Sequence, residues 1–182
     1  MATIIDGKKI SAEIRAEIAE EVKMMKESGV CPGLAVIIVG ENPASQVYVR
    51  NKGRACAEVG IYSEFIELPA ETTEAELLSK IEELNVREEI HGILVQLPLP
   101  KHIDEKAVIA AILPEKDVDA FSEGNVGKIM IGNHSFLPCT PAGVMVLLEK
   151  SGINVSGKEC VVVGRSNIVM VMGPTPPGTG VI

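Results

Sequence analysis

The sequence predicts an α/β fold in which a mostly parallel sheet is built from βαβ units. Residues 34–39 and 91–97 are apolar runs typical of strands covered on both faces, and residues 63–68 form a further expected strand. Segments with the apolar spacing of amphipathic helices separate these strands. Strands that alternate with helices indicate βαβ units, whose ligands usually bind at the carboxyl ends of the strands. We therefore expect ligand contacts after the first and third strands.

The first two helices are predicted by apolar periodicity and by residues that favour helix ends. From Ile10 apolar residues recur at helical spacing, and Gly29 stops the pattern. Asn42 is a good N-cap for the second helix, Pro43 suits its first position, and Gly60 can close it.

Two further helices and a hairpin follow along the chain. The segment 73–76 reads Thr-Glu-Ala-Glu, the capping-box pattern that begins a helix. Asp104 can cap a short helix that runs through Ile112. Between Asn125 and Leu137, two short apolar runs flank Gly-Asn, which predicts a β-hairpin.

The last part of the chain predicts a second α/β unit. Thr140-Pro141 opens a helix that ends at Gly152, and residues 160–163 read as the strand that follows. We therefore divide the chain into one domain at residues 1–121 and the start of another at residues 122–182.

Composition excludes several classes of function. The 182 residues are 46% hydrophobic, which is enough for a substantial core, and the formal charge of −8 argues against a nucleic-acid partner. Four cysteines and three histidines are too dispersed to predict a metal site. The first residues carry charges and no long apolar run, so neither a signal peptide nor a membrane span is expected. The plain interpretation is a cytoplasmic protein with reduced thiols.

Tyr48 and Lys52 are the first candidate site residues. They stand four apart in the second predicted helix, so both side chains leave the same face. If that face lines a cleft, the amine can hold and move a proton while the phenol orients it. The alternative is an exposed pair on a solvated helix, which amphipathic helices carry routinely.

Five sequence motifs occur in an order that resembles the bifunctional methylenetetrahydrofolate dehydrogenase/cyclohydrolase family. The resemblance runs from about residue 4 to residue 169. The motifs are Tyr48-x-x-x-Lys52, Val95-Gln-Leu-Pro-Leu-Pro100, Glu115-Lys-Asp-Val-Asp119, Pro138-Cys-Thr-Pro141 and Val161-Val-Val-Gly-Arg-Ser166.

The resemblance implies a folate site in which Tyr48, Lys52 and Gln96 are catalytic. Hydrolysis of methenyltetrahydrofolate requires a base that accepts a proton from the attacking water. A lysine at its usual pKa of about 10.4 is a poor base at neutral pH, so the site must disfavour the ammonium form. Gln96 fits this requirement, because a neutral amide orients the amine without holding it protonated as a carboxylate would.

Asp119 and Pro98 complete the implied folate site. A carboxylate can accept the two adjacent N–H donors of a pterin ring, so Asp119 is the expected partner of that ring. Pro98 is the expected wall of the cleft. Taken without the resemblance, Asp119 is also explained as a turn residue and Pro98 as a strand terminator.

The resemblance also implies an NADP cofactor, a Rossmann-like NADP-binding domain and a homodimer. Gly164, Arg165 and Ser166 follow the predicted strand at 160–163, where a helix N-terminus could receive phosphate. Arg165 suits the 2′-phosphate that distinguishes NADP from NAD, because its planar guanidinium keeps a fixed charge. Without the family this motif is weak, since the G-x-G-x-x-G pattern is absent.

Two departures from the family pattern leave other functions open. The sequence stops resembling the family after Val169, and about thirty residues after Gly152 cannot build a whole dinucleotide domain, so we expect no NADP-dependent oxidation by this polypeptide. Ala120 stands where the family commonly has glycine, which we expect to alter the turn beside Asp119. One alternative is therefore a folate-binding remnant, and another is a short-chain dehydrogenase, which also uses Tyr-x-x-x-Lys.

Overall fold

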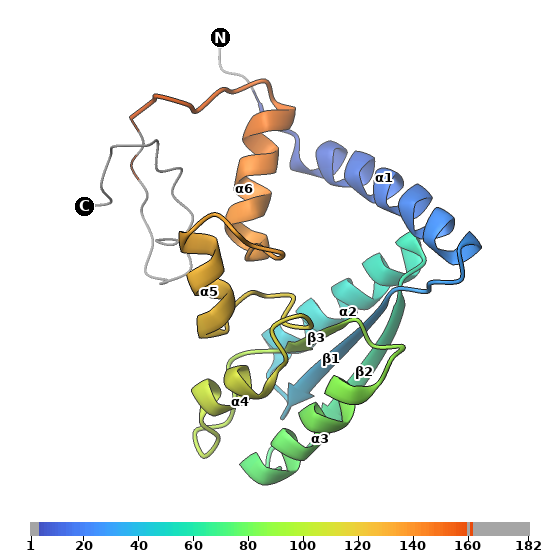
Figure 1. Cartoon of the computed structure of the whole chain (residues 1–182), viewed down its shortest axis with the longest axis vertical. Coiled ribbons are helices and arrows are strands. Elements are labelled where there is room, and N and C mark those ends of the chain that lie inside the picture. The colour runs from blue at the N-terminus through green and yellow to red at the C-terminus, as the bar shows by residue number, and fades with distance from the viewer. Residues whose placement is uncertain (1–3, 160, 162–182) are drawn as a thin grey trace.

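A three-stranded parallel sheet forms the centre of the protein (Figure 1). The structure is a computed structural model that describes residues 4–159 and 161. The strand order is β2-β1-β3, with β1 at Gly33–Val39, β2 at Tyr62–Leu68 and β3 at Gly92–Val95. Parallel pairing and intervening helices confirm the predicted βαβ architecture.

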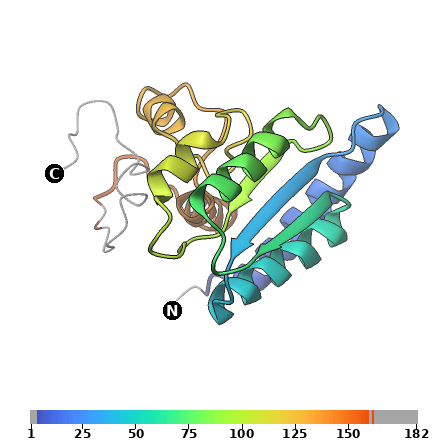
Figure 2. The same ribbon diagram turned by 90° about the horizontal axis from the view of Figure 1, so that it is seen from below.

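The central strand β1 contributes to two hydrophobic cores. Its alternate residues point to opposite faces, as expected for extended backbone. Ala35, Ile37 and Val39 belong to the core that includes α3 and α4 residues, whereas Val36 and Ile38 pack with Val49 of α2. Helices therefore cover both faces of the sheet (Figure 2).

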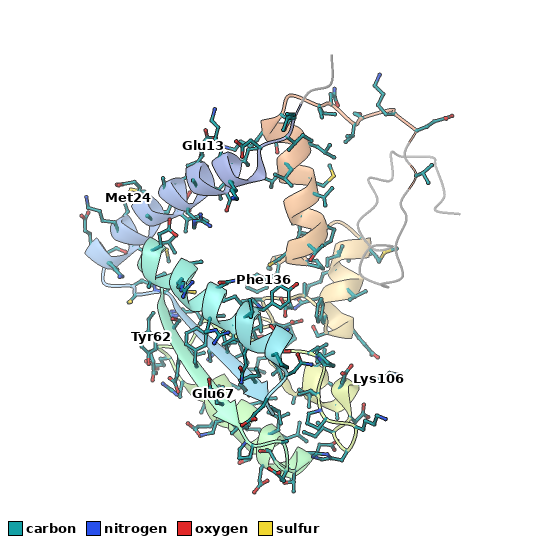
Figure 3. All side chains as sticks on the ribbon, turned by 180° about the vertical axis from the view of Figure 1, so that it is seen from behind. Glu13, Met24, Tyr62, Glu67, Lys106 and Phe136 are labelled. Carbon is teal, nitrogen blue, oxygen red and sulfur yellow. The ribbon has the colours of Figure 1, made fainter. Side chains whose placement is uncertain are left out.

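Edge strand β2 is more exposed than β1 and β3. Every residue of β3 is buried, whereas the side chains of β2 are exposed or half-buried. Tyr62 and Glu67, near the two ends of β2, are both exposed (Figure 3). This explains why its sequence mixes charged with apolar residues while the other strands read as continuous apolar runs.

Most of the predicted helices form with the predicted caps. The predicted capping box at Thr73 and the predicted cap at Asp104 are both present. Asp6, which was not predicted as a cap, also caps α1 by accepting from the backbone N–H of Lys8 at 3.1 Å. The helices are α1 Gly7–Glu27, α2 Pro43–Val59, α3 Glu74–Val86, α4 Glu105–Ala111, α5 Glu123–Met130 and α6 Cys139–Lys150.

The predicted hairpin between Asn125 and Leu137 is wrong, because α5 occupies its first half. Ser122 caps this helix by accepting from the Asn125 backbone N–H at 3.3 Å. Gly132, with φ of 74°, then ends the helix, and the Asn133 N–H donates to the Lys128 carbonyl at 2.9 Å. The Gly-Asn pair is thus a helix C-cap rather than a hairpin turn.

The second predicted unit is described as far as α6 and the turns that follow it. Lys150 of α6 forms an ion pair with Glu17 of α1, with 2.9 Å between Nζ and Oε1. Of the strand predicted at 160–163, Val161 alone is described, and the other three residues lie outside the described residues.

Candidate active site

Helix α2 positions Tyr48 and Lys52 beside the carboxyl end of the sheet. Asn42 Oδ1 accepts from the Ser45 backbone N–H at 3.2 Å, so the helix begins where the sequence predicts. Val49, between the two candidate residues, is buried against β1. Packing of Val49 fixes which face of α2 looks toward β1 and β3.

Lys52 and Gln96 are in direct contact, although 44 residues separate them in sequence. Lys52 Nζ donates to Gln96 Oε1 at 3.1 Å. Gln96 Nε2 donates in turn to the Leu97 carbonyl at 2.9 Å, which fixes the orientation of the amide. The Gln96 backbone N–H donates to Ile37 of β1, so the amide stands directly at the end of the sheet. The structure therefore brings together the predicted base and its predicted neutral partner.

Tyr48 and Pro98 lie at the exposed margin of this site. Tyr48 is 62% exposed and stands one helical turn before Lys52. Pro98 is exposed and follows Leu97 through a cis peptide bond. Both positions are compatible with contact to a bound molecule that covers the margin.

Asp119 stands in a turn that is attached to the outer edge of β3. Ile93 of β3 donates its N–H to the Lys116 carbonyl at 2.8 Å and forms a parallel bridge with Asp117. Burial raises the pKa of Asp119, the Lys52 ammonium opposes this rise, and the negative charge of Asp117 adds to it. The carboxyl group of Asp119 is therefore close enough to the Lys52 amine for the two charges to interact.

A small apolar cavity of about 10 Å³ borders Asp119. Residues of β3, Leu97 and Phe121 line it together with α4 residues such as Val108 and Ile112. Asp117 and Asp119 are the acidic residues among those that line it. A cavity of this size holds about one water molecule, so a larger ligand would contact Asp119 from outside it.

Ala120, where the sequence departs from the resembled family, has an unusual backbone conformation. It has φ of 55°, in the left-handed region that favours glycine, and it is fully buried. An L-alanine there carries backbone strain of about 1–2 kcal/mol. The left-handed backbone conformation at residue 120 is therefore one that glycine would adopt without this strain.

Cys139, the first residue of α6, belongs to the same neighbourhood and was missed as a candidate. Desolvation raises the pKa of its thiol, Asp119 raises it further, and Lys52 opposes both. The thiol therefore lies near the carboxyl and the amine. The motif Pro138-Cys-Thr-Pro141 was the signal in the sequence, since it is one of the five ordered motifs.

Asp117 is the other residue that sequence reasoning missed. It is 2% exposed, and its carboxylate accepts hydrogen bonds from the residues that follow Asp119. The sequence offered its membership of the motif Glu115-Lys-Asp-Val-Asp119, which gives no indication of burial.

The expected cofactor residues Gly164, Arg165 and Ser166 lie outside the described residues. Within residues 4–159 and 161, no group of three or more His, Cys, Asp or Glu side chains is placed to hold a metal ion. Among the helices that the structure describes, none has the length and apolar character needed to cross a membrane.

Two family profiles match the sequence. Residues 5–119 match the tetrahydrofolate dehydrogenase/cyclohydrolase catalytic domain, and residues 138–172 match the NAD(P)-binding domain of the same family. The first match ends at Asp119, and the second begins one residue before Cys139. The short-chain dehydrogenase alternative is therefore wrong.

Similar proteins agree with these matches. The chain is 67% identical over 168 residues to the bifunctional protein FolD of Moorella thermoacetica, covering 92% of this chain and 60% of that protein. It is 61% identical over 168 residues to the FolD protein of Lysinibacillus sphaericus, covering 92% of this chain and 59% of that one. The chain thus spans about 60% of the length of the curated relatives it matches.

Solved structures show the same fold. The FolD methylenetetrahydrofolate dehydrogenase/cyclohydrolase of Campylobacter jejuni superposes with a TM-score of 0.90 at 46% identity, covering 93% of this chain and 62% of that one. The Trypanosoma brucei enzyme, solved with NADP and an inhibitor, gives 0.89 at 42% identity, covering 93% and 60%. The family profile over residues 5–119, the α/β fold and the Lys52–Gln96–Asp119 neighbourhood lead to one conclusion: the chain belongs to the tetrahydrofolate dehydrogenase/cyclohydrolase family.

Proposed function

We propose that this chain carries the folate site of an enzyme of one-carbon metabolism. The enzyme oxidises 5,10-methylenetetrahydrofolate with NADP and hydrolyses the 5,10-methenyl product to 10-formyltetrahydrofolate. The observation that carries the proposal is the 3.1 Å hydrogen bond from Lys52 Nζ to Gln96 Oε1, made beside Asp119.

Lys52 is the proton carrier in the proposed hydrolysis. Water attacks the cationic one-carbon bridge of methenyltetrahydrofolate, and the proton it loses needs an acceptor nearby. A neutral amine at Lys52 accepts that proton on Nζ. Gln96 holds the amine through an uncharged oxygen, so it orients Nζ without the strong preference for the ammonium form that a carboxylate would impose. Tyr48, one turn earlier on α2, supplies a phenol at the same margin of the site.

Asp119 binds the pterin ring in this proposal. Its carboxylate accepts the ring N–H and the exocyclic amine side by side, in a pair of charge-assisted hydrogen bonds. Pro98, exposed at the margin of the site, contributes to the wall of the proposed cleft. Binding at Asp119 then directs the one-carbon bridge toward Lys52, because these two side chains interact across the site.

NADP is the proposed cofactor, and Gly164, Arg165 and Ser166 are its proposed contacts. Support comes from the NAD(P)-binding profile over residues 138–172 and from the relative that was solved with NADP. NADP would supply the hydride acceptor for the oxidation step. A homodimer in the cytoplasm, with residues 1–121 as its folate domain, completes the proposal.

Lys52→Met tests the hydrolytic role. Methionine fills a similar volume but carries no transferable proton, so we expect the chain to fold and the hydrolysis of methenyltetrahydrofolate to fall to the spontaneous rate. The measurement is loss of methenyltetrahydrofolate absorbance at neutral pH with purified protein.

The matched control is Lys23→Met on α1, an exposed lysine that should leave turnover unchanged. Near wild-type turnover in Lys52→Met would remove Lys52 from the mechanism. If the wild-type chain binds a folate but never exceeds the spontaneous rate, it is a folate-binding remnant.

A further inference from the structure

A buried carboxylate with three hydrogen bonds stands two residues before Asp119. Asp117 Oδ2 accepts from the Ser122 backbone N–H at 2.9 Å and from Asn125 Nδ2 at 3.0 Å. Asp117 Oδ1 accepts from the Phe121 backbone N–H at 3.3 Å. A carboxylate that is 2% exposed persists because these donors replace its lost hydration.

The same network fixes the turn from both sides. The Ala120 N–H donates to the Asp117 carbonyl at 3.1 Å, closing a turn whose inner residues are Val118 and Asp119. Asn125 Nδ2 also donates to the Pro114 carbonyl at 2.9 Å. Asn125 is 3% exposed. Its buried amide therefore links Pro114, before the turn, to the carboxylate of Asp117, which in turn binds the backbone after the turn.

The turn is also fixed against β3. A Cβ built on Gly92 would lie 2.5 Å from Val118 Cγ1, so the side chain that precedes Asp119 sits directly on the strand backbone. Asp119 is therefore held between a strand contact at Val118 and a left-handed Ala120.

Asp117 makes the ionised form of Asp119 less favourable, because two negative charges stand close together. Across the site, Lys52 of α2 favours the ionised form of Asp119, and the charge of Asp119 in turn raises the pKa of Cys139 of α6. The charge of Asp117 therefore destabilises the ionised form of Asp119. The hydrogen bonds through which Asp117 fixes the turn compensate for this repulsion.

We propose that Asp117, together with Asn125, is a positioning residue that presents the Asp119 carboxylate to the pterin ring. The proposal rests on the proposed role of Asp119 in folate binding. Asp117 touches no substrate in this account; it acts through the backbone of residues 120–122.

Asn125→Ala tests the proposal without changing any charge. Loss of the amide loosens the turn and exposes Asp119 to water, so we expect the pKa of Asp119 to fall toward its ordinary value. We also expect affinity for 5-formyltetrahydrofolate to weaken about tenfold, the equivalent of one good hydrogen bond. Carbon-13 NMR titration of the Asp119 carboxyl and isothermal titration calorimetry of the 182-residue chain measure the two effects.

Asn85→Ala is the matched control, because Asn85 also bridges a nearby loop. Its side chain donates to the Ala111 carbonyl at 2.8 Å and accepts from the Leu113 N–H at 3.1 Å. We expect this variant to lose stability but to keep the Asp119 titration and the folate affinity of the wild type. Equal effects of Asn125→Ala and Asn85→Ala on both readouts would overturn the proposal.

Asp117→Asn provides a second variant in case Asn125→Ala fails to fold. It replaces one acceptor oxygen with a donor, so amide hydrogen exchange at Phe121 and Ser122 should accelerate at least tenfold relative to the β1 amides. Unchanged exchange there would overturn the proposal. If the wild-type chain binds no 5-formyltetrahydrofolate, the proposed function fails, whereas exchange and the Asp119 titration still decide the positioning role.

Discussion

Lys52 is hydrogen-bonded to an oxygen that carries no formal charge. The choice of amide over carboxylate at Gln96 matters because a carboxylate 3.1 Å from Nζ would favour the ammonium form, which cannot accept a proton. Asp119 supplies the negative charge of the site from a separate turn. In the proposed mechanism, the base and the charge that binds the substrate are thus separate residues.

Asp119→Asn should weaken folate binding while making the protein more stable at neutral pH. The amide can accept only one of the two pterin donors, and its own donor opposes the other. We expect a loss of roughly 1.5–3 kcal/mol, about tenfold to a hundredfold in Kd. Calorimetric titration with 5-formyltetrahydrofolate measures it, and an unchanged Kd would make Asp119 only a turn residue.

The stability effect of Asp119→Asn has a defined pH dependence. The folded-state pKa of Asp119 is raised above the unfolded value of about 3.9, so the folded protein retains a proton that the unfolded chain has released. The contribution of Asp119 to stability is therefore present below about pH 3.9 and is lost as pH rises through the folded-state pKa. Urea unfolding should show the variant more stable than wild type at pH 7, with the gap closing near pH 3. A gap of the same size at both pH values would contradict this assignment.

Helix α2 is placed by the absence of a side chain at Gly53. A Cβ built there would lie 2.8 Å from Cε2 and Cζ of Phe65 on β2, so alanine would fit only if the Phe65 ring shifted. Gly53 is the residue after Lys52. A shift of α2 at Gly53 would therefore also move Lys52 relative to Gln96 and change their hydrogen bond.

Gly53→Ala should destabilise the protein even though alanine favours helices. The gain in helix propensity is about 1 kcal/mol, whereas overpacking typically costs about 1–3 kcal/mol. Gly127→Ala on α5 is the matched control, because nothing lies within 4 Å of its Cβ position, and it should stabilise by about 0.5–1 kcal/mol. Urea unfolding compares the two, and equal stabilisation by both substitutions would show that Phe65 yields freely.

Elements whose signals are local could be predicted from the sequence. The capping box at Thr73, the Asn42 cap and the buried strand β1 each depend on residues within one segment. The hairpin prediction failed because glycine followed by asparagine suits both a hairpin turn and a helix C-cap, and Ser122 upstream decided between them.

Only part of the candidate site could be predicted from the sequence. The rule that ligands bind at the carboxyl ends of parallel strands placed Lys52 and Gln96 at one edge, and the structure joins them. The burial of Asp117 and the nearness of Cys139 to Asp119 depend on how distant segments pack, which no local pattern encodes.

At the scale of the whole molecule, the described part of the chain gathers the candidate folate residues from three separate segments. They come from α2, from the end of β3 and from the turn bridged to β3. A second, open groove lies between α1 and α2 around Val22, Lys26 and Gly60, and it contains none of the predicted site residues. The candidate site and this groove are therefore separate regions of the described chain.

The most direct test of the folate site is a map of backbone amide shifts during titration of the 182-residue chain with 5-formyltetrahydrofolate. We expect saturable changes concentrated at residues 48–53, 96–99 and 117–121, with the α1–α2 groove unchanged. Changes confined to that groove around Lys26 and Gly60, or no saturable change at all, would contradict the assignment of Lys52, Gln96 and Asp119 to one folate site.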